Sequence, residues 1–504
     1  MSQPCKFSRR DMLRGTGASI ALPMLSTLSP SVSRAEQAEA TCFTDATGLA
    51  ESIRNKELSP VELMRMHLDR VEAINPKLNA IVTLADGCLE RARQAEKAVM
   101  RGELLGPLHG VPFTIKDVFD TRGVRTTRGS HIFKDRVPDK DATLVKRLKK
   151  AGGILLGKTN LPEFALSAET TNELFGRTVN PWNPDRTCGG STGGEAAAIA
   201  AGLSPLGIGS DLGGSNRLPA HYCGIVGLKP THGRIPLTGH WPELLARFMH
   251  AGPLARSVRD VALASSVMSG SDDQDPYAFR ATMPEAINLH APLPRLRVGW
   301  FAEGPFHPVE KSIRETVAQA ASALHDLGCH VDPVSLPDWE AYLPIDVCYH
   351  LLAAEGTQYL EPYLAGHDDL LSSSIAALMQ LPKPSLKQFI DACERCEQLR
   401  KDLAEFFARF DLLLCPTAPL VAHAHDAEAL LIEGQEVSPS HAATITASFG
   451  LTGSPAISIP FGFSDDGLPI GVQLVAHRYD EATLLHAASA LETVYQPEFR
   501  HPLL

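Results

Sequence analysis

Two glycine-framed serines within one short stretch constrain this chain more than any other feature. Residues 189–230 read GGSTGGEAAAIAAGLSPLGIGSDLGGSNRLPAHYCGIVGLKP, with Ser191 in the first Gly-Gly-Ser and Ser215 in the second. An alanine-rich helical segment, 195–202, and a short apolar strand, 206–208, lie between them. Glycine weakens helices and strands, so paired glycines are expected where the backbone adopts positive φ or approaches a ligand closely. Tight turns in βαβ elements are the alternative interpretation, and two matched copies favour a site.

Helix and strand patterns alternate along most of the chain. A capping box with proline at the first helical position starts a helix at Ser59, and a basic amphipathic helix is expected at 141–151. Short apolar strands are expected at 110–117 and 154–158, and others at 297–300, 412–414, 456–460 and 470–475. This alternation predicts an α/β fold, with a large mixed, mostly parallel β-sheet covered by helices on both faces. The helical residues 335–440 are the expected insert near the substrate entrance.

Composition narrows the class of protein. The chain has 504 residues, of which 44% are hydrophobic and 21% charged, which is typical of a soluble protein with a large core. Its formal net charge of −11 makes it a poor candidate for binding nucleic acid or an anionic membrane. No apolar run reaches the roughly 20 residues that a spanning helix needs, so no membrane insertion is expected.

The first 40 residues resemble a targeting segment. Ser8-Arg9-Arg10-Asp11-Met12-Leu13 precedes a weakly apolar run, 15–28, and a small-residue segment that ends at Ala40. This order is that of a twin-arginine export signal, with a disordered basic N-terminus as the alternative. We therefore expect residues 1–40 to be a signal peptide, residues 41–504 to form a single domain, and the protein to be periplasmic or secreted.

The cysteines do not indicate a disulfide framework or a metal site. Ten are scattered through the chain, and Cys5 belongs to the expected signal. Cys393 and Cys396 form a CxxC pair, but within a charged helical pattern, 386–410, and without a second pair. Zinc or redox chemistry is therefore not favoured, and no metal is predicted.

A serine nucleophile needs a base, and the sequence offers two ways to supply one. A buried lysine can serve when it is neutral, and Lys116, Lys158 and Lys229 each end a strand-like run. Alternatively, residues 189–193 satisfy GxSxG, the nucleophile elbow of α/β-hydrolases, which would need an acid and a downstream histidine such as His423. The elbow should follow a strand directly, whereas residues 180–188 read as a loop.

Several further motifs make the chain similar to the amidase signature family. They are Gly110-Val-Pro-Phe-Thr-Ile-Lys-Asp, Gly157-Lys-Thr-Asn-Leu-Pro-Glu-Phe, the stretch from Asn180-Pro-Trp-Asn to Pro230, Gly453-Ser-Pro-Ala-Ile-Ser-Ile-Pro and Gly467-Leu-Pro-Ile-Gly-Val-Gln-Leu. The resemblance implies the amidase signature fold and a Ser–cis-Ser–Lys mechanism without any cofactor. Carried over, Ser215 is the nucleophile, Ser191 the bridging serine after a cis peptide, and Lys116 the base. The backbone N–H groups of Leu212, Gly213, Gly214 and Ser215 correspond to the oxyanion hole, with Asp211 and Arg217 as a supporting pair.

Three residues depart from the family pattern, namely Cys188, Thr192 and Asn216, and they bear on substrate preference rather than on catalysis. Thr192 is expected to support the site, and Asn216 to alter the pocket wall. The loop 239–252 is rich in aromatic residues. It can pack against the sheet or, as we expect, line the acyl pocket. The expected lining residues are Trp241, Phe248, Met249 and Asn216.

These features predict a hydrolase that cleaves the C–N bond of a neutral, hydrophobic or aryl small-molecule amide. Carbamate and peptide C-terminal amide hydrolysis are alternatives of the same mechanism. Different classes are an esterase that uses Ser191 and a non-catalytic binding protein. The family also includes the subunit that makes ammonia for tRNA-dependent amidation, but that role is cytosolic and needs partner subunits, so the export signal argues against it. A homodimer is compatible with the sequence.

Overall fold

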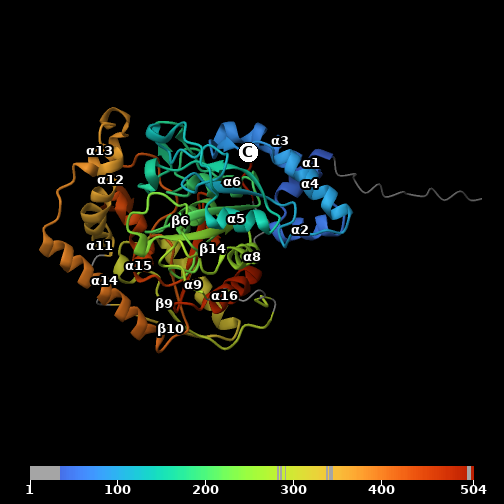
Figure 1. Cartoon of the computed structure of the whole chain (residues 1–504). Coiled ribbons are helices and arrows are strands. Elements are labelled where there is room, and N and C mark those ends of the chain that lie inside the picture. The colour runs from blue at the N-terminus through green and yellow to red at the C-terminus, as the bar shows by residue number, and fades with distance from the viewer. Residues whose placement is uncertain are drawn as a thin grey trace, which may run out of the picture.

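A single large β-sheet runs through the centre of the molecule (Figure 1). The computed structural model describes residues 34–280, 283, 287–289, 291–336, 339, 344–495 and 501–504. The expected twin-arginine motif, 8–13, and the apolar run, 15–28, lie outside the described residues. The expected cleavage point at Ala40 lies inside the first described helix, Arg34–Cys42, where the Ala40 carbonyl accepts a hydrogen bond from the Thr44 hydroxyl.

Within the described residues the sheet has eleven strands, in the order β1-β3-β2-β6-β8-β7-β14-β15-β11-β9-β10. Four neighbouring pairs run parallel and six antiparallel. The strands are β1 (Ile81–Leu84), β2 (Pro112–Lys116), β3 (Ile154–Thr159), β6 (Leu206–Asp211), β7 (Val226–Lys229), β8 (His250–Ala255), β9 (Arg297–Trp300), β10 (His330–Pro333), β11 (Leu412–Pro416), β14 (Ala456–Phe463) and β15 (Pro469–Ala476).

Helices pack on both faces of this sheet. Helices α6 and α7 contact one another and strands near the centre of the sheet. Helices α5, α8, α16 and α9 form a row in which each helix contacts the next. The helices are α1 (Arg34–Cys42), α2 (Ala46–Arg54), α3 (Pro60–Leu78), α4 (Cys88–Met100), α5 (Thr143–Lys150), α6 (Gly193–Ala200), α7 (Arg217–Cys223), α8 (Val258–Met268), α9 (Lys311–Asp326), α11 (Pro344–Leu351), α12 (Thr357–Leu364), α13 (Ser373–Met379), α14 (Leu386–Phe407), α15 (Thr444–Thr452) and α16 (Glu481–Val494).

The observed architecture confirms the predicted fold class. The sheet is mixed, and the strands expected from apolar runs lie within one or a few residues of the observed ones. Parallel pairs are fewer than the alternation of helices and strands suggested. The hairpin of β14 and β15 and the reversed strand β8 place antiparallel neighbours at the centre of the sheet. The pairing of β8 between β6 and β7 depends on long connections that a local pattern does not encode.

Two glycines in β6 let the serine-bearing segments approach the sheet closely. A Cβ atom at Gly207 would lie 1.9 Å from the Glu195 carboxyl of α6, and one at Gly209 would lie 2.3 Å from both Thr192 and Asn216. Side chains at these positions would separate α6 and the loops from the strand. The small residues of β6 therefore bring both Gly-Gly-Ser segments to the same end of the same strand.

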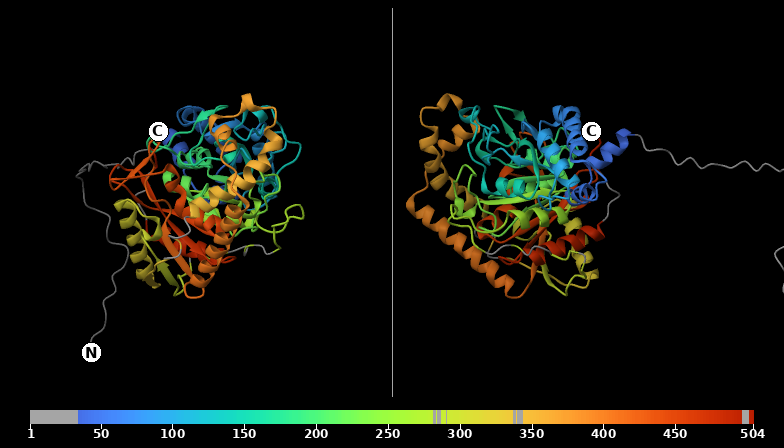
Figure 2. Two further views of the ribbon diagram at one scale, coloured as in Figure 1. Left: turned by 90° about the vertical axis from the view of Figure 1, so that its left-hand side faces the viewer. Right: turned by 45° about the vertical axis from the view of Figure 1, so that its right-hand side comes forward.

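The helices of the expected insert lie along one side of the molecule, opposite α1–α4 (Figures 1 and 2). Helix α11 contacts both α14 and α15, so the insert packs onto the body of the fold through these helices. The C-terminus lies near the first helices, where the rings of His501 and Phe43 stack 4.1 Å apart. Among the described helices, none combines the length and apolar character required to cross a bilayer.

Asp260 of α8 fixes the start of α2 across a long sequence separation. Its carboxylate accepts hydrogen bonds from the Ala46 and Thr47 amides at 2.7 and 2.8 Å and from the Thr47 hydroxyl at 2.7 Å.

We expect Asp260→Ala to lower the free energy of unfolding by about 1–3 kcal/mol, because buried N–H groups lose their acceptor. Urea denaturation would measure this loss, with exposed Asp69→Ala as the control. Equal stability of both variants would contradict the prediction.

Candidate active site

Lys116 is the last residue of β2 and is completely buried at the centre of the site. Its Nζ lies 2.6 Å from Ser191 Oγ, 3.0 Å from Thr192 Oγ1 and 3.2 Å from Ser210 Oγ. A neutral amine has two N–H donors and one lone pair. When neutral, Lys116 can therefore donate to two of these hydroxyls and accept a hydrogen bond from that of Ser191.

Burial lowers the pKa of Lys116 to about 7, and the carboxylates of Asp211 and Glu195 act in the opposite direction. Neither carboxylate is a direct partner of Nζ: Asp211 binds Arg217, and Glu195 binds the hydroxyls of Thr114 and Thr159. Burial also raises the pKa of Glu195 to about 8, despite those hydroxyls. A lysine whose pKa lies near neutrality can act as a general base at physiological pH.

The first Gly-Gly-Ser presents its serine to this lysine. The Gly190–Ser191 peptide bond is cis, as the family resemblance implied, and α6 begins two residues later. The Thr192 hydroxyl contacts Lys116 and donates to the Ser210 carbonyl or to Asn216 Oδ1. Thr192 therefore holds the lysine in place.

The second Gly-Gly-Ser forms a turn that the Asp211 carboxylate holds from inside. It accepts the amides of Gly214 and Asn216 at 2.8 and 3.1 Å and both Nε and Nη2 of Arg217 at 2.9 Å. Both side chains of this ion pair are completely buried. Burial acts to raise the pKa of Asp211, but the Arg217 guanidinium outweighs it and the pKa lies below its usual value. The ion pair thus fixes the turn that carries Ser215.

The same turn restricts which backbone amides can serve an oxyanion. Gly214 has φ of +128°, and a Cβ atom there would lie 2.1 Å from Thr446 Oγ1, so only glycine fits. Its amide already donates to Asp211. The amides of Leu212, Gly213 and Ser215 are therefore the candidates for an oxyanion hole, and Gly214 serves the turn instead.

Ser191 and Ser215 line one cavity of about 160 Å³. The described lining is mainly apolar and contains one histidine, His240, and no charged side chain. Of the four lining residues expected from the sequence, Met249 is present. The other three, Trp241, Phe248 and Asn216, are not among the lining residues.

These three residues make contacts elsewhere in the fold. Asn216 is buried and donates to the carbonyls of Leu228 and Gly252. The ring of Trp241 packs against aromatic neighbours, and Phe248 packs beneath Arg247 and Arg400. Residues of α11, among them Ile345 and Tyr349, line the cavity instead.

The tertiary structure distinguishes among Lys116, Lys158 and Lys229, which the sequence left as three candidate bases. Lys158 Nζ donates to the Phe119 carbonyl and to Thr121 and Thr126, and lies 3.5 Å from Asp117. Lys229 Nζ is held by the Ser454 and Pro230 carbonyls and by His250. Of the three lysines, only Lys116 hydrogen-bonds to serines that line the catalytic cavity.

The nucleophile-elbow alternative lacks its base in the structure. Ser191 is bonded to Lys116, and the histidine suggested by the sequence, His423, hydrogen-bonds to the Ala424 carbonyl and is not part of the described lining. The residues directly before Gly189 form no strand. Residues 189–193 therefore match GxSxG because they form the turn that carries Ser191 after its cis peptide bond.

The sequence did not single out Ser210 or Glu195 as part of the site. Ser210 contacts Lys116, and Glu195 is buried beneath β2 and β3 through Thr114 and Thr159. Both could have been suspected from their positions, since Ser210 immediately precedes Asp211 and a glutamate in an alanine-rich helix is costly to bury.

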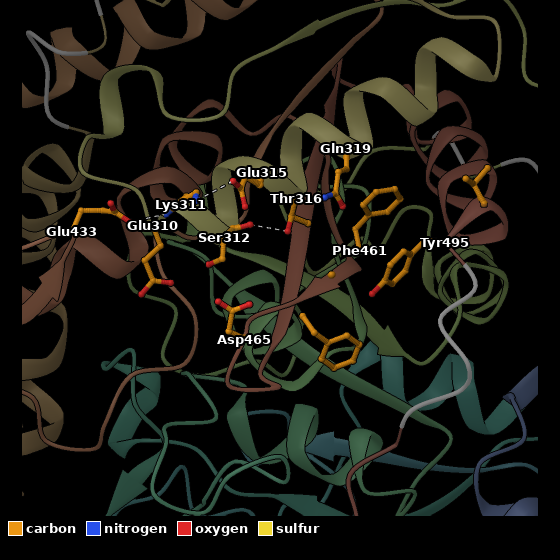
Figure 3. A pocket seen from close by; sticks show the side chains of 13 residues that line it. Glu310, Lys311, Ser312, Glu315, Thr316, Gln319, Glu433, Phe461, Asp465 and Tyr495 are labelled. Carbon is orange, nitrogen blue, oxygen red and sulfur yellow. Dashed lines mark hydrogen bonds and ion pairs between the residues drawn. The ribbon is translucent and has the colours of Figure 1, made fainter.

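A larger cavity of about 890 Å³ lies between α9 and the outer part of β14 (Figure 3). Acidic side chains, among them Glu310, Glu315 and Glu433, surround it together with Lys311. It contains none of the serines or lysines described above. No group of histidine, cysteine and acidic residues in the described parts of the chain is arranged to hold a metal ion, and the nine described cysteines are free.

Two serines that line one cavity, with a buried lysine hydrogen-bonded to one of them, form the arrangement of serine enzymes that use lysine in place of histidine as the base. The amidase family model matches residues 62–485. The chain belongs to the amidase family, and its Ser-Ser-Lys site is the one expected for an enzyme of that family.

Relatives and solved structures agree with this assignment. The glutamyl-tRNA(Gln) amidotransferase A-subunit of Carboxydothermus hydrogenoformans is 35% identical over 89% of this chain and 97% of its own length. That of Moorella thermoacetica is 35% identical over 92% and 99%. A bacterial aryl acylamidase has a TM-score of 0.83 at 28% identity, over 90% of this chain and 97% of its own. The solved A-subunit of Thermotoga maritima has a TM-score of 0.73 at 27% identity, over 92% and 98%.

These relatives contradict two expectations drawn from the sequence. The expected small-molecule hydrolase for hydrophobic or aryl amides is wrong, because the curated relatives share the name of an amidotransferase component. The expected export is likewise contradicted, because these relatives are named for an enzyme of glutamyl-tRNA(Gln) and not for an exported protein. A paired arginine before a short apolar run is too weak a pattern to outweigh similarity over nine-tenths of the chain.

We expect kcat/KM for amide cleavage to rise with pH and level off above a midpoint near 7. Burial lowers the pKa of Lys116 to about 7, so its fraction of neutral amine grows as pH rises through that value. Lys116→Ala should lose the rise and about 10²–10⁴-fold in rate. Initial rates between pH 5 and 9 would test this, with Lys149→Ala as a surface control. A wild-type pH profile in Lys116→Ala would identify the wrong lysine.

The two serines should also differ in covalent chemistry. Ser215→Ala should form no adduct with a fluorophosphonate serine reagent, because the nucleophilic oxygen is gone. Ser191→Ala should still form one slowly, since it lacks only the proton relay to Lys116. Intact-mass spectrometry distinguishes the two variants. An adduct on Ser215→Ala that is absent from Ser191→Ala would favour Ser191 as the nucleophile.

Proposed function

We propose that this chain is the amide-cleaving component of an amidotransferase that acts on glutamyl-tRNA(Gln). The observation that carries the proposal is the 34–36% identity to the A-subunit of that enzyme over 88–92% of the chain. The cluster of Ser191, Ser215 and Lys116 supports it, because these are the groups needed to release ammonia from a carboxamide. A component of this kind supplies ammonia, and the acceptor is the glutamyl group on the tRNA.

The proposed reaction is an acyl transfer through Ser215. Its oxygen attacks the carboxamide carbon while its proton passes through Ser191 to neutral Lys116. The amides of Leu212, Gly213 and Ser215 stabilise the negative charge on the carbonyl oxygen. The C–N bond then breaks, and the proton returns through Ser191 to the leaving nitrogen, which departs as ammonia. Water attacks the acyl-enzyme and gives a carboxylate and free Ser215.

Because the described lining has no charged side chain, other parts of the enzyme must supply the contacts for ionic groups of the ammonia donor. A carboxamide fits a narrow, apolar cavity, whereas ionic groups elsewhere on a donor would lose hydration without gaining an ion pair. We assign those groups to the mouth of the cavity, where a partner protein can meet them. Contacts with tRNA are also assigned to a partner, because this chain carries a net charge of −11.

The test is ammonia release from L-glutamine by the chain alone, with its partner subunits, and with glutamyl-tRNA(Gln) added. We expect release to increase at least tenfold in the complete assembly and to yield glutaminyl-tRNA, with Ser215→Ala inactive in every arm. Glutamine turnover that ignores the partners and the tRNA would contradict the proposal. Rapid cleavage of uncharged amides by the chain alone, with no product on tRNA, would also contradict it.

A further inference from the structure

One buried polar atom in the catalytic cavity has no partner among the described residues. His240 lines the cavity together with Ser191 and Ser215, and only 2% of its surface is exposed. Its Nε2 makes no hydrogen bond within the described structure. A buried ring nitrogen without a partner costs stability unless a ligand completes it. The reaction steps proposed above do not use this group.

The loop that carries His240 is attached to the segment that follows the catalytic lysine. His240 forms a β-bridge with Phe119, and the Trp241 amide donates to the Val118 carbonyl at 3.1 Å. The Asp120 amide donates to the Gly239 carbonyl at 2.8 Å. The imidazole packs edge-on against the Phe119 ring, with centroids 5.1 Å apart. The position of the ring is therefore set relative to Lys116 before any substrate binds.

The imidazole is neutral at any working pH. Burial, followed by the positive charges of Lys116 and Arg128, lowers the pKa of His240 to about 3. A neutral imidazole has one N–H and one lone pair. The Pro242 carbonyl accepts the ring N–H, and Nε2 is the nitrogen without a partner. Nε2, in a ring that lines the cavity, therefore carries the lone pair and requires an N–H or O–H donor.

We propose that His240 Nε2 accepts a hydrogen bond from the nitrogen of the scissile carboxamide and so orients the leaving group. The carbonyl oxygen of the amide is directed to the backbone amides of the Ser215 turn, which leaves the NH₂ group as the donor nearest to the remaining wall. When one N–H is held by His240, the nitrogen lone pair is free to take a proton from Ser191. His240 itself transfers no proton.

The inference rests on amide cleavage at Ser215 as proposed above, and not on the identity of the acceptor. It makes the site selective for amides with an N–H group over esters, because an ester oxygen carries no hydrogen to donate. His240 is thus a specificity-determining residue for the leaving group. A residue that only packed in the wall would affect amides and esters of one acyl group equally.

The experiment compares an amide with an ester of the same acyl group. kcat/KM would be measured for L-glutamine and L-glutamate γ-methyl ester, and for butyramide and methyl butyrate, with the full chain in whichever assembly turns them over. We expect His240→Phe to lower the amide-to-ester ratio about tenfold, and His240→Gln, which retains an acceptor, to restore part of it. His232→Phe is the matched control, since His232 lies outside the lining and bonds to the Ala246 carbonyl. Equal losses for amide and ester would overturn the inference.

A binding measurement keeps the test independent of turnover. In Ser215→Ala, the ¹⁵N resonance of His240 Nε2 would be followed during titration with butyramide and with methyl butyrate, and assigned by its loss in His240→Phe. We expect an upfield shift with the amide only, because a lone pair that accepts a hydrogen bond is shielded. No shift, or the same shift with both, would overturn the inference. If His240→Phe lowers the amide-to-ester ratio of kcat/KM but ammonia release does not respond to tRNA, this inference holds and the proposed function fails.

Discussion

The catalytic site depends on one constraint, which is the burial of Lys116 without an acidic partner. An ammonium group in this position would be stripped of water and surrounded only by hydroxyls and one carbonyl. The neutral amine is favoured because the charged form loses more hydration than the hydroxyls return. The central position of β2, between β3 and β6, produces this burial.

The buried charges nearest to the site have partners of their own, and this arrangement keeps Lys116 neutral. Asp211 is paired with Arg217, which also donates to Gln473, and Lys158 is paired with Asp117. If Asp211 were the direct partner of Lys116, the lysine would remain charged and could not accept a proton. The buried ion pair at the Ser215 turn therefore has two effects, because it shapes the turn and it removes a carboxylate from the base.

The fold and the family restrict the type of reaction at the site more than they restrict the choice of substrate. Solved structures of similar fold include an aryl acylamidase and a 6-aminohexanoate cyclic dimer hydrolase, which is 32% identical with a TM-score of 0.82. In this chain the end of β2 and the two serine turns carry the reacting groups, whereas α11 and the loop around His240 contribute to the cavity wall. The names of these neighbours refer to different amides, so the shared fold does not by itself fix the substrate.

Local sequence pattern was enough to locate the elements and loops that carry the site. Apolar periodicity predicted β2, β3, β6 and most helices, and the two Gly-Gly-Ser segments identified the loops of Ser191 and Ser215. These signals are readable in the sequence because helix and strand periods and the conformations open to glycine act over a few residues. The resemblance to a family, rather than any periodicity, supplied the choice of Lys116 and the bridging role of Ser191.

Which residues face one another across long separations was visible only in the folded chain. There Lys158 and Lys229 have other partners, and neither Asn216 nor Trp241 is among the residues that line the cavity. The Gly214 amide donates to Asp211, and His240 lines the same cavity as the two serines. The direction of a side chain in a loop follows from strand order and from packing between segments distant in sequence, and no local pattern records either.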